Sequence, residues 1–205
     1  MSFINDCSNA TLLKLQKYLT DKGIVVQSIK PFVGLDNKTY GDLKVVGFKN
    51  DDTPIQLNVD FKQQIKTDEY IYIELLYIRA DGTPDGWLWN QNIDMAIYEL
   101  KDGRVFAITH QQLLQIARAY NTDAMWNSSV VYSKNPAQFE IERKWINQKL
   151  DEQNVFPIKL PDIIIGPENS HIRACYNFNT YENKRVLSGF SMALEPEVLE
   201  KFQIN

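Results

Sequence analysis

The sequence predicts a mixed α/β fold, in which helices flank a β-sheet and a further segment extends the chain at its C-terminal end. Two observations indicate this fold. An amphipathic helical pattern near the N-terminus is followed by strand-like segments between residues 42 and 109, and two more helical patterns come after those strands. This order of elements is typical of an α+β protein or a mixed α/β sandwich.

The composition is that of an ordinary globular protein. Of the 205 residues, 44% are hydrophobic and 23% are charged, which suits one domain with additions. The two cysteines lie far apart and belong to no Cys/His cluster, so we expect reduced thiols and no zinc site. No apolar run reaches the roughly 20 residues of a membrane-spanning helix, and no signal-peptide pattern is present. We therefore expect a cytoplasmic protein without membrane contact.

The formal net charge of −4 restricts the possible partners. Proteins that coat nucleic acid are normally basic, so the charge counts against that class. It does not exclude a nuclease, because carboxylates hold the metal ion of such an enzyme and a local group of lysines is enough to bind phosphates.

The first helix is predicted to begin at Ser8 or Asn9, either of which can cap its N-terminus. Apolar residues then recur at helical spacing. The helix is expected to end at Lys22, because Gly23 suits the left-handed position that follows a helix.

Three strands are predicted next, over residues 42–48, 55–62 and 70–78. The polar residues 49–54 have turn chemistry, so the first two strands should form a hairpin. The third strand is almost continuously apolar and aromatic, a pattern typical of a central strand that is covered on both faces.

A second hairpin is predicted from strands over residues 93–100 and 104–109, which an Asp-Gly turn joins. Thr109 can cap a helix that runs through residues 111–120.

The chain is predicted to divide at residue 120. Residues 1–120 form the core, and residues 121–205 form a helical and irregular extension packed on it. In this extension we expect a helix over residues 136–150 and only short strand-like runs, such as residues 162–165.

The first hairpin carries the residues that indicate chemistry. Because side chains alternate along a strand, Asp60 and Lys62 share one face, and the apolar Val59 and Phe61 point to the other. Asp42 opens the partner strand, where antiparallel pairing brings it opposite the end of the second strand. Two carboxylates and one ammonium are therefore expected to converge.

This combination fits the hydrolysis of phosphodiesters with Mg²⁺ or Mn²⁺. Asp42 and Asp60 offer the hard oxygen ligands that Mg²⁺ prefers. The metal polarises the phosphate and lowers the pKa of bound water, and Lys62 can orient that water or stabilise charge on the phosphate oxygens.

Glu74 is a fourth candidate for the site, because we expect the third strand to lie next to the second. It could act as a further metal ligand or as a residue that orients water. It lies within the apolar strand 70–78, so we expect its carboxylate to be nearly buried and to need a partner or a metal ion.

Asp42, followed after 17 residues by Asp60-Phe61-Lys62, resembles the motif of the PD-(D/E)xK nuclease superfamily, which includes restriction endonucleases and Holliday-junction resolvases. The resemblance covers roughly residues 8–120. It implies a restriction-endonuclease-like fold, DNA as substrate, Asp42 and Asp60 as ligands of Mg²⁺, and Lys62 as the residue that assists the attacking water.

Two further features resemble this superfamily and one departs from it. Glu74 resembles the acidic residue that members often carry in a following strand, and Gly86-Trp87 resembles a segment that comes after it. The departure is Gly41, which stands where the motif has proline.

Two other interpretations stay open. The protein could be a DNA- or protein-binding module that retains a nuclease scaffold without activity, or a structural subunit of a phage or mobile element. Asp60 and Lys62 would then form an ordinary ion pair on a solvated sheet face. We expect DNA as the partner, and a homodimer is one possible assembly.

Overall fold

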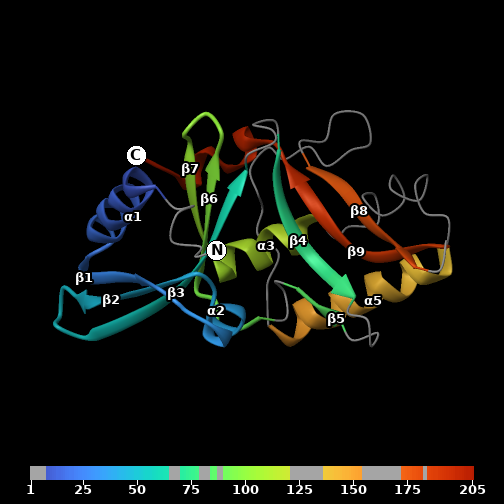
Figure 1. The fold of residues 1–205 in the computed structure, drawn as a ribbon, viewed down its shortest axis with the longest axis horizontal. Helices are drawn as coiled ribbons and strands as arrows, with labels where there is room; N and C mark the ends of the chain where they lie inside the picture. The colour runs from blue at the N-terminus through green and yellow to red at the C-terminus, as the bar shows by residue number, and fades with distance from the viewer. Residues whose placement is uncertain are drawn as a thin grey trace. The chain divides into compact units, whose positions relative to one another are not determined.

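A computed structural model describes residues 8–64, 70–78, 84–86, 90–120, 136–153, 172–181 and 184–205. These residues form a mixed α/β structure, which confirms the predicted fold class (Figure 1). The chain divides into two compact units. The first comprises Met1–Glu69, Gln91–His110 and Leu199–Asn205, and the second comprises Tyr70–Asn90 and Gln111–Val198. The sequence instead predicts a single division, at residue 120.

The first unit is built on a six-stranded sheet with the order β1-β2-β3-β6-β7-β10. Every neighbouring pair is antiparallel except β3 and β6, which run parallel. The strands are β1 (Ile24–Pro31), β2 (Leu43–Lys49), β3 (Pro54–Gln64), β6 (Met95–Leu100), β7 (Val105–Thr109) and β10 (Gln203–Ile204). Helix α1 (Asn9–Asp21) precedes the sheet, and the short helix α2 (Leu35–Tyr40) lies between β1 and β2.

Helix α1 begins and ends as the sequence predicts. The Ser8 side chain accepts a hydrogen bond from the Thr11 backbone N–H at 3.1 Å and so caps the helix. Lys22 is the C-terminal cap, and Gly23 follows it with a φ of +79°. The helix buries Leu15 and Leu19 on the face that it turns toward the sheet.

One face of the sheet and helix α1 share the hydrophobic core of the first unit. Strand residues at alternate positions contribute to it, as expected for a sheet with one face packed against a helix. The buried members are Leu15, Leu19, Leu43, Val45, Val59, Met95, Ile97, Val105, Ala107 and Ile204. Residues between these positions therefore point to the opposite face of the sheet.

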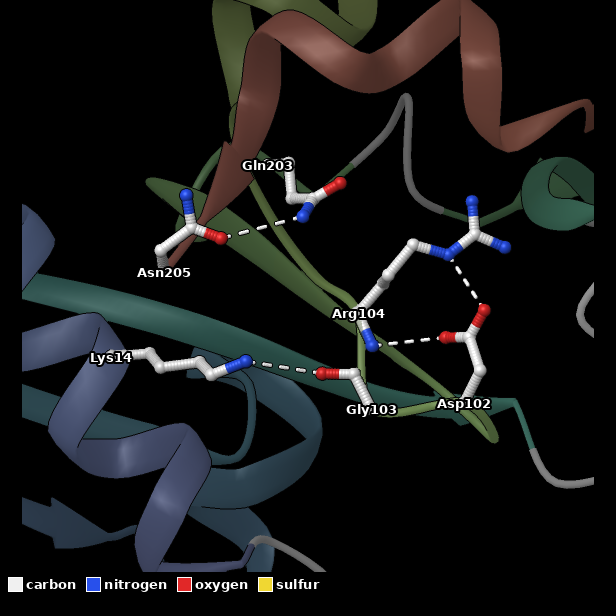
Figure 2. A network of polar contacts seen from close by, with 6 residues as sticks. All are labelled: Lys14, Asp102, Gly103, Arg104, Gln203 and Asn205. Atoms are coloured by element: carbon white, nitrogen blue, oxygen red, sulfur yellow. Dashed lines mark hydrogen bonds and ion pairs between the residues drawn. The ribbon is translucent and has the colours of Figure 1, made fainter.

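Both predicted hairpins are confirmed. In the first, β2 pairs antiparallel with β3, and Leu43 lies opposite Val59. In the second, β6 pairs with β7 around a turn in which the Asp102 carboxylate accepts hydrogen bonds from the Arg104 backbone N and Nε at 2.9 and 2.7 Å (Figure 2). Lys14 of α1 donates to the Gly103 carbonyl at 3.1 Å, so the helix is also bonded to this turn.

The predicted strand at residues 70–78 forms, as β4 (Ile71–Ile78), but its predicted position beside β3 is wrong. It belongs to the second unit, and β6 is the strand that lies beside β3. Nor is β4 covered on both faces, because Ile71 and Ile73 are buried whereas Tyr72 is 40% exposed. Over residues 71–74 the buried isoleucines alternate with the exposed Tyr72 and Glu74, so this part of an apparently uniform apolar run has one exposed face.

The second unit contains a four-stranded sheet of order β5-β4-β9-β8. Its other strands are β5 (Pro84–Asp85), β8 (Ile172–Tyr181) and β9 (Lys184–Leu194), and its helices are α3 (His110–Tyr120) and α5 (Pro136–Glu152). Both helices match the prediction closely, whereas the β8–β9 hairpin is absent from it. The predicted run at residues 162–165 lies outside the described residues. None of the described helices is long and apolar enough to cross a membrane.

The buried hydroxyl of Thr11 yields a test of how α1 is attached to the sheet. It donates a 2.8 Å hydrogen bond to the Glu99 carboxylate of β6, and Thr11 is only 2% exposed. Thr11→Val should lower the free energy of unfolding by about 1–3 kcal/mol, measured by urea denaturation, because the charged partner loses its bond. Thr20→Val removes an exposed hydroxyl from the same helix and is the control. Equal effects of the two variants would contradict the prediction.

Candidate functional site

The backbone at Gly41 brings Asp42 against β3. Gly41 has a φ of +88°, a conformation that residues with a side chain rarely adopt. A Cβ at this position would lie 2.9 Å from the Val59 carbonyl oxygen and 3.1 Å from the Asp60 nitrogen. Only glycine allows this close approach.

Two hydrogen bonds to β3 then fix Asp42. Its backbone N–H donates to the Val59 carbonyl at 2.9 Å, and its carboxylate Oδ2 accepts from the Phe61 backbone N–H at 2.8 Å. The carboxylate therefore lies beside the segment that connects Asp60 to Lys62. The predicted approach of Asp42 to the second strand of the hairpin is confirmed by these two hydrogen bonds.

Asp60 and Lys62 lie side by side on β3, on the face opposite α1. Their neighbours Val59 and Phe61 belong to the core, as the alternation predicts. Asp60 is only 8% exposed, whereas the Lys62 side chain is 53% exposed. The Lys62 Nζ lies 3.2 Å from Asp60 Oδ1 and 3.1 Å from Oδ2, so one ammonium contacts both carboxylate oxygens.

The surroundings of Asp60 disfavour its charge. Burial is the largest cause, and together with the negative charge of Asp42 it raises the pKa of Asp60 to about 6, although the Lys62 ammonium acts in the opposite direction. The Asp42 and Asp60 carboxylates are therefore close enough to repel each other. A cation between them would relieve this repulsion.

Asp94 is a neighbouring carboxylate that is not among the predicted site residues. Its Oδ2 accepts from the Asn58 backbone N–H at 2.7 Å, and the Asn58 side chain donates to the Asn92 carbonyl at 2.8 Å. These bonds attach the start of β6 to β3. No local pattern could predict them, because the parallel pairing joins residues 36 positions apart.

The expectation for Glu74 is wrong in two respects. It lies on β4, in the sheet of the second unit, and so is not on the strand beside β3. Its side chain is exposed and not nearly buried, so burial gives no reason to assign it a metal ion. Trp87, the other feature that resembles the superfamily in this region, lies outside the described residues.

The donor atoms of the site fit a hard divalent cation. Among the described residues there is no group of three or more His, Cys, Asp and Glu side chains that could hold a metal. Asp42 and Asp60 could offer two carboxylates to such a cation. Mg²⁺ is commonly bound in this way, through one or two carboxylates and substrate phosphates.

Comparisons with protein-family models, curated proteins and solved structures find no match to this chain. A functional assignment therefore depends on the residues and geometry of the site itself.

The close approach at Gly41 yields a prediction with a matched control. Gly34 also has a positive φ, +68°, but a Cβ there would meet no atom within 4 Å. Gly34→Ala should cost only the backbone strain of about 1–2 kcal/mol. Gly41→Ala should cost about 1–3 kcal/mol more, because the methyl group also meets the β3 backbone. Denaturant unfolding measures both, and equal losses would show that the contact with β3 is unimportant.

The raised pKa of Asp60 predicts how stability depends on pH. The folded state holds this proton up to about pH 6, whereas the unfolded chain releases it near 3.8. The contribution of Asp60 is thus fully present below pH 4 and is lost as pH rises to about 6. Asp60→Asn should raise the free energy of unfolding at pH 7 by about 1–3 kcal/mol and reduce its change between pH 4 and 7.

The control for this measurement is Asp36→Asn, which changes an exposed carboxylate on α2. It should change the free energy of unfolding at pH 7 by no more than about 0.5 kcal/mol, as is usual for an exposed substitution. A destabilising effect of Asp60→Asn at pH 7 would contradict the assigned electrostatics.

Proposed function

We propose that this protein is a metal-dependent nuclease that hydrolyses DNA phosphodiester bonds at Asp42, Asp60 and Lys62. The observation that carries the proposal is the position of Asp60, which is buried beside a second carboxylate and contacted by one ammonium. An ordinary ion pair on a solvated face would leave both partners exposed. Burial of a charged group without full compensation is costly and is typical of functional sites.

The three residues have two roles in the proposed reaction. Asp42 and Asp60 present oxygen atoms to Mg²⁺ or Mn²⁺, and Phe61 N–H holds the Asp42 carboxylate in orientation. The bound metal ion would supply Lewis acidity and a water of lowered pKa. Water attacks phosphorus and the P–O bond to the leaving oxygen breaks. One proton of the water is lost to solvent and the leaving oxygen takes one up, so a phosphate monoester and a hydroxyl group result.

Lys62 is suited to stabilise charge in this reaction. About half of its side chain is exposed, so a phosphate oxygen can approach the ammonium while it remains next to Asp60. Negative charge that builds on the phosphate oxygens is then met by a positive group within a partly buried site, where electrostatic stabilisation is strong. DNA as the partner and a cytoplasmic location are parts of this proposal.

The test is cleavage of plasmid and branched DNA in Mg²⁺ or Mn²⁺ by wild type, Lys62→Ala and Asp42→Asn. We expect cleavage by wild type, a loss of about 100-fold or more in both variants because each removes a group that acts on the reacting phosphate, and no cleavage in EDTA. Lys101→Ala changes an exposed lysine in the β6–β7 turn and should retain full activity.

Metal binding is measured separately by thermal unfolding. Mn²⁺ should raise the Tm of wild type and leave that of Asp42→Asn unchanged, because a ligand that binds only the folded state stabilises it. Equal cleavage by wild type and Lys62→Ala would overturn the mechanism. Absence of both cleavage and a Mn²⁺ effect would favour a binding module without activity.

A further inference from the structure

A pair of lysines lies beside the carboxylate site, on the same face of the sheet. Lys30 of β1 is paired with Lys44 of β2, which in turn is paired with Asn58 of β3. Both lysines follow the alternation that places their neighbours Ile29 and Val45 in the core, so they point to the face that carries Asp60. From strand spacing and rise, the Lys44 and Asp60 Cα atoms are about 8 Å apart.

This lysine pair is electrostatically unfavourable as it stands. Side chains directly opposite on antiparallel strands have Cβ atoms about 4.5–5.5 Å apart, and like charges at that distance are destabilising. Within the part of the chain that the structure describes, neither lysine forms an ion pair. Two adjacent ammonium groups of this kind are complementary to a ligand that carries several negative charges.

An exposed segment with several apolar side chains, residues 32–40, borders the same site. The described residues include six exposed large hydrophobic side chains, and Val33, Leu35 and Tyr40 are three of them, with exposures of 71%, 80% and 37%. The segment is bonded to the site at one end and continuous with it at the other. The Phe32 N–H donates to the Asp42 carbonyl at 2.9 Å, and Tyr40 directly precedes Gly41.

The aromatic ring of Tyr40 is held in place and remains partly exposed. It packs on the Phe32 ring with the centroids 5.6 Å apart and the planes inclined by 31°. A partly exposed ring on a fixed support is a suitable surface for a nucleobase to stack on. The base faces of a duplex are already stacked on one another, so this surface fits a strand with unpaired bases.

We propose that Lys30 and Lys44 bind the phosphates of a polynucleotide strand with unpaired bases, that Tyr40 stacks on one of its bases, and that this subsite leads the strand to Asp42 and Asp60. The inference rests on the proposed function in one respect, namely that the bound strand is then cleaved. Binding of the strand requires no cleavage and can be measured without it. The substrate class is then single-stranded or locally unpaired nucleic acid.

The experiment measures binding of a fluorescein-labelled oligothymidylate and of a duplex of equal length, by anisotropy in EDTA over a range of salt concentrations. Wild type should bind the single strand more tightly than the duplex. Lys30→Gln/Lys44→Gln should weaken single-strand binding about tenfold at low salt and reduce the slope of log K against log[salt] by about 1.4, the value for two phosphate contacts.

Two further variants separate charge from stacking. Tyr40→Leu keeps an apolar contact with Phe32 but removes the ring, so it should weaken single-strand binding about tenfold without changing the salt slope. Lys17→Gln/Lys101→Gln removes the same charge from an exposed helix position and from the β6–β7 turn, and should change binding less than twofold.

Folding and activity controls make the outcomes distinct. Lys30→Gln/Lys44→Gln should unfold at a higher Tm than wild type, because the repulsion between the lysines is removed.

Equal weakening by both double variants, tighter binding of the duplex, or no binding by wild type would each overturn the subsite. Cleavage with unaltered binding in Lys30→Gln/Lys44→Gln would reject the subsite alone, and wild-type binding without cleavage would reject the nuclease alone.

Discussion

Contact between Gly41 and the backbone of β3 is the constraint on which the candidate site depends. It brings the start of β2 so close to Val59 and Asp60 that no side chain fits between them. The Asp42 carboxylate then reaches the Phe61 N–H, and the β2–β3 register places Lys44 opposite Asn58, on the face that carries Asp60. The same register turns Leu43 and Val59 toward α1, so the packing of the core and the geometry of the site are set together.

Much of the first unit could be predicted from the sequence because its signals are local. The caps of α1, the two hairpins and the alternation around Asp60 each depend on a few adjacent residues. The parallel pairing of β3 with β6 could not be predicted in this way, since it joins strands that are separated by β4 and β5 of the other unit. The misplacement of β4 has this origin. The expectation of a buried Glu74 has another, because residues 70–78 look uniformly apolar although Tyr72 and Glu74 are exposed.

The β8–β9 hairpin was missed for a different reason. Polar and apolar residues largely alternate along Ile172–Tyr181, which is a strand pattern, but Asn177 and Asn179 at its polar positions reduce its β-propensity. Pairing with β9 stabilises this strand, although local propensity does not favour it. Within the site, sequence alternation correctly placed Asp60 and Lys62, yet only the structure reveals that one is buried and the other is half exposed.

The division into units has a consequence for how the chain becomes organised. The backbone passes between the two units four times, at the boundaries that follow Glu69, Asn90, His110 and Val198. The first unit is completed only when β10, near residue 204, pairs with β7 and places Ile204 in the core. Closing such long chain loops costs entropy before the contacts that offset it can form. A fragment cut at residue 120 would lack this last strand. The sheet that carries Asp42 and Asp60 is therefore complete only when residues 203–204 have paired with β7.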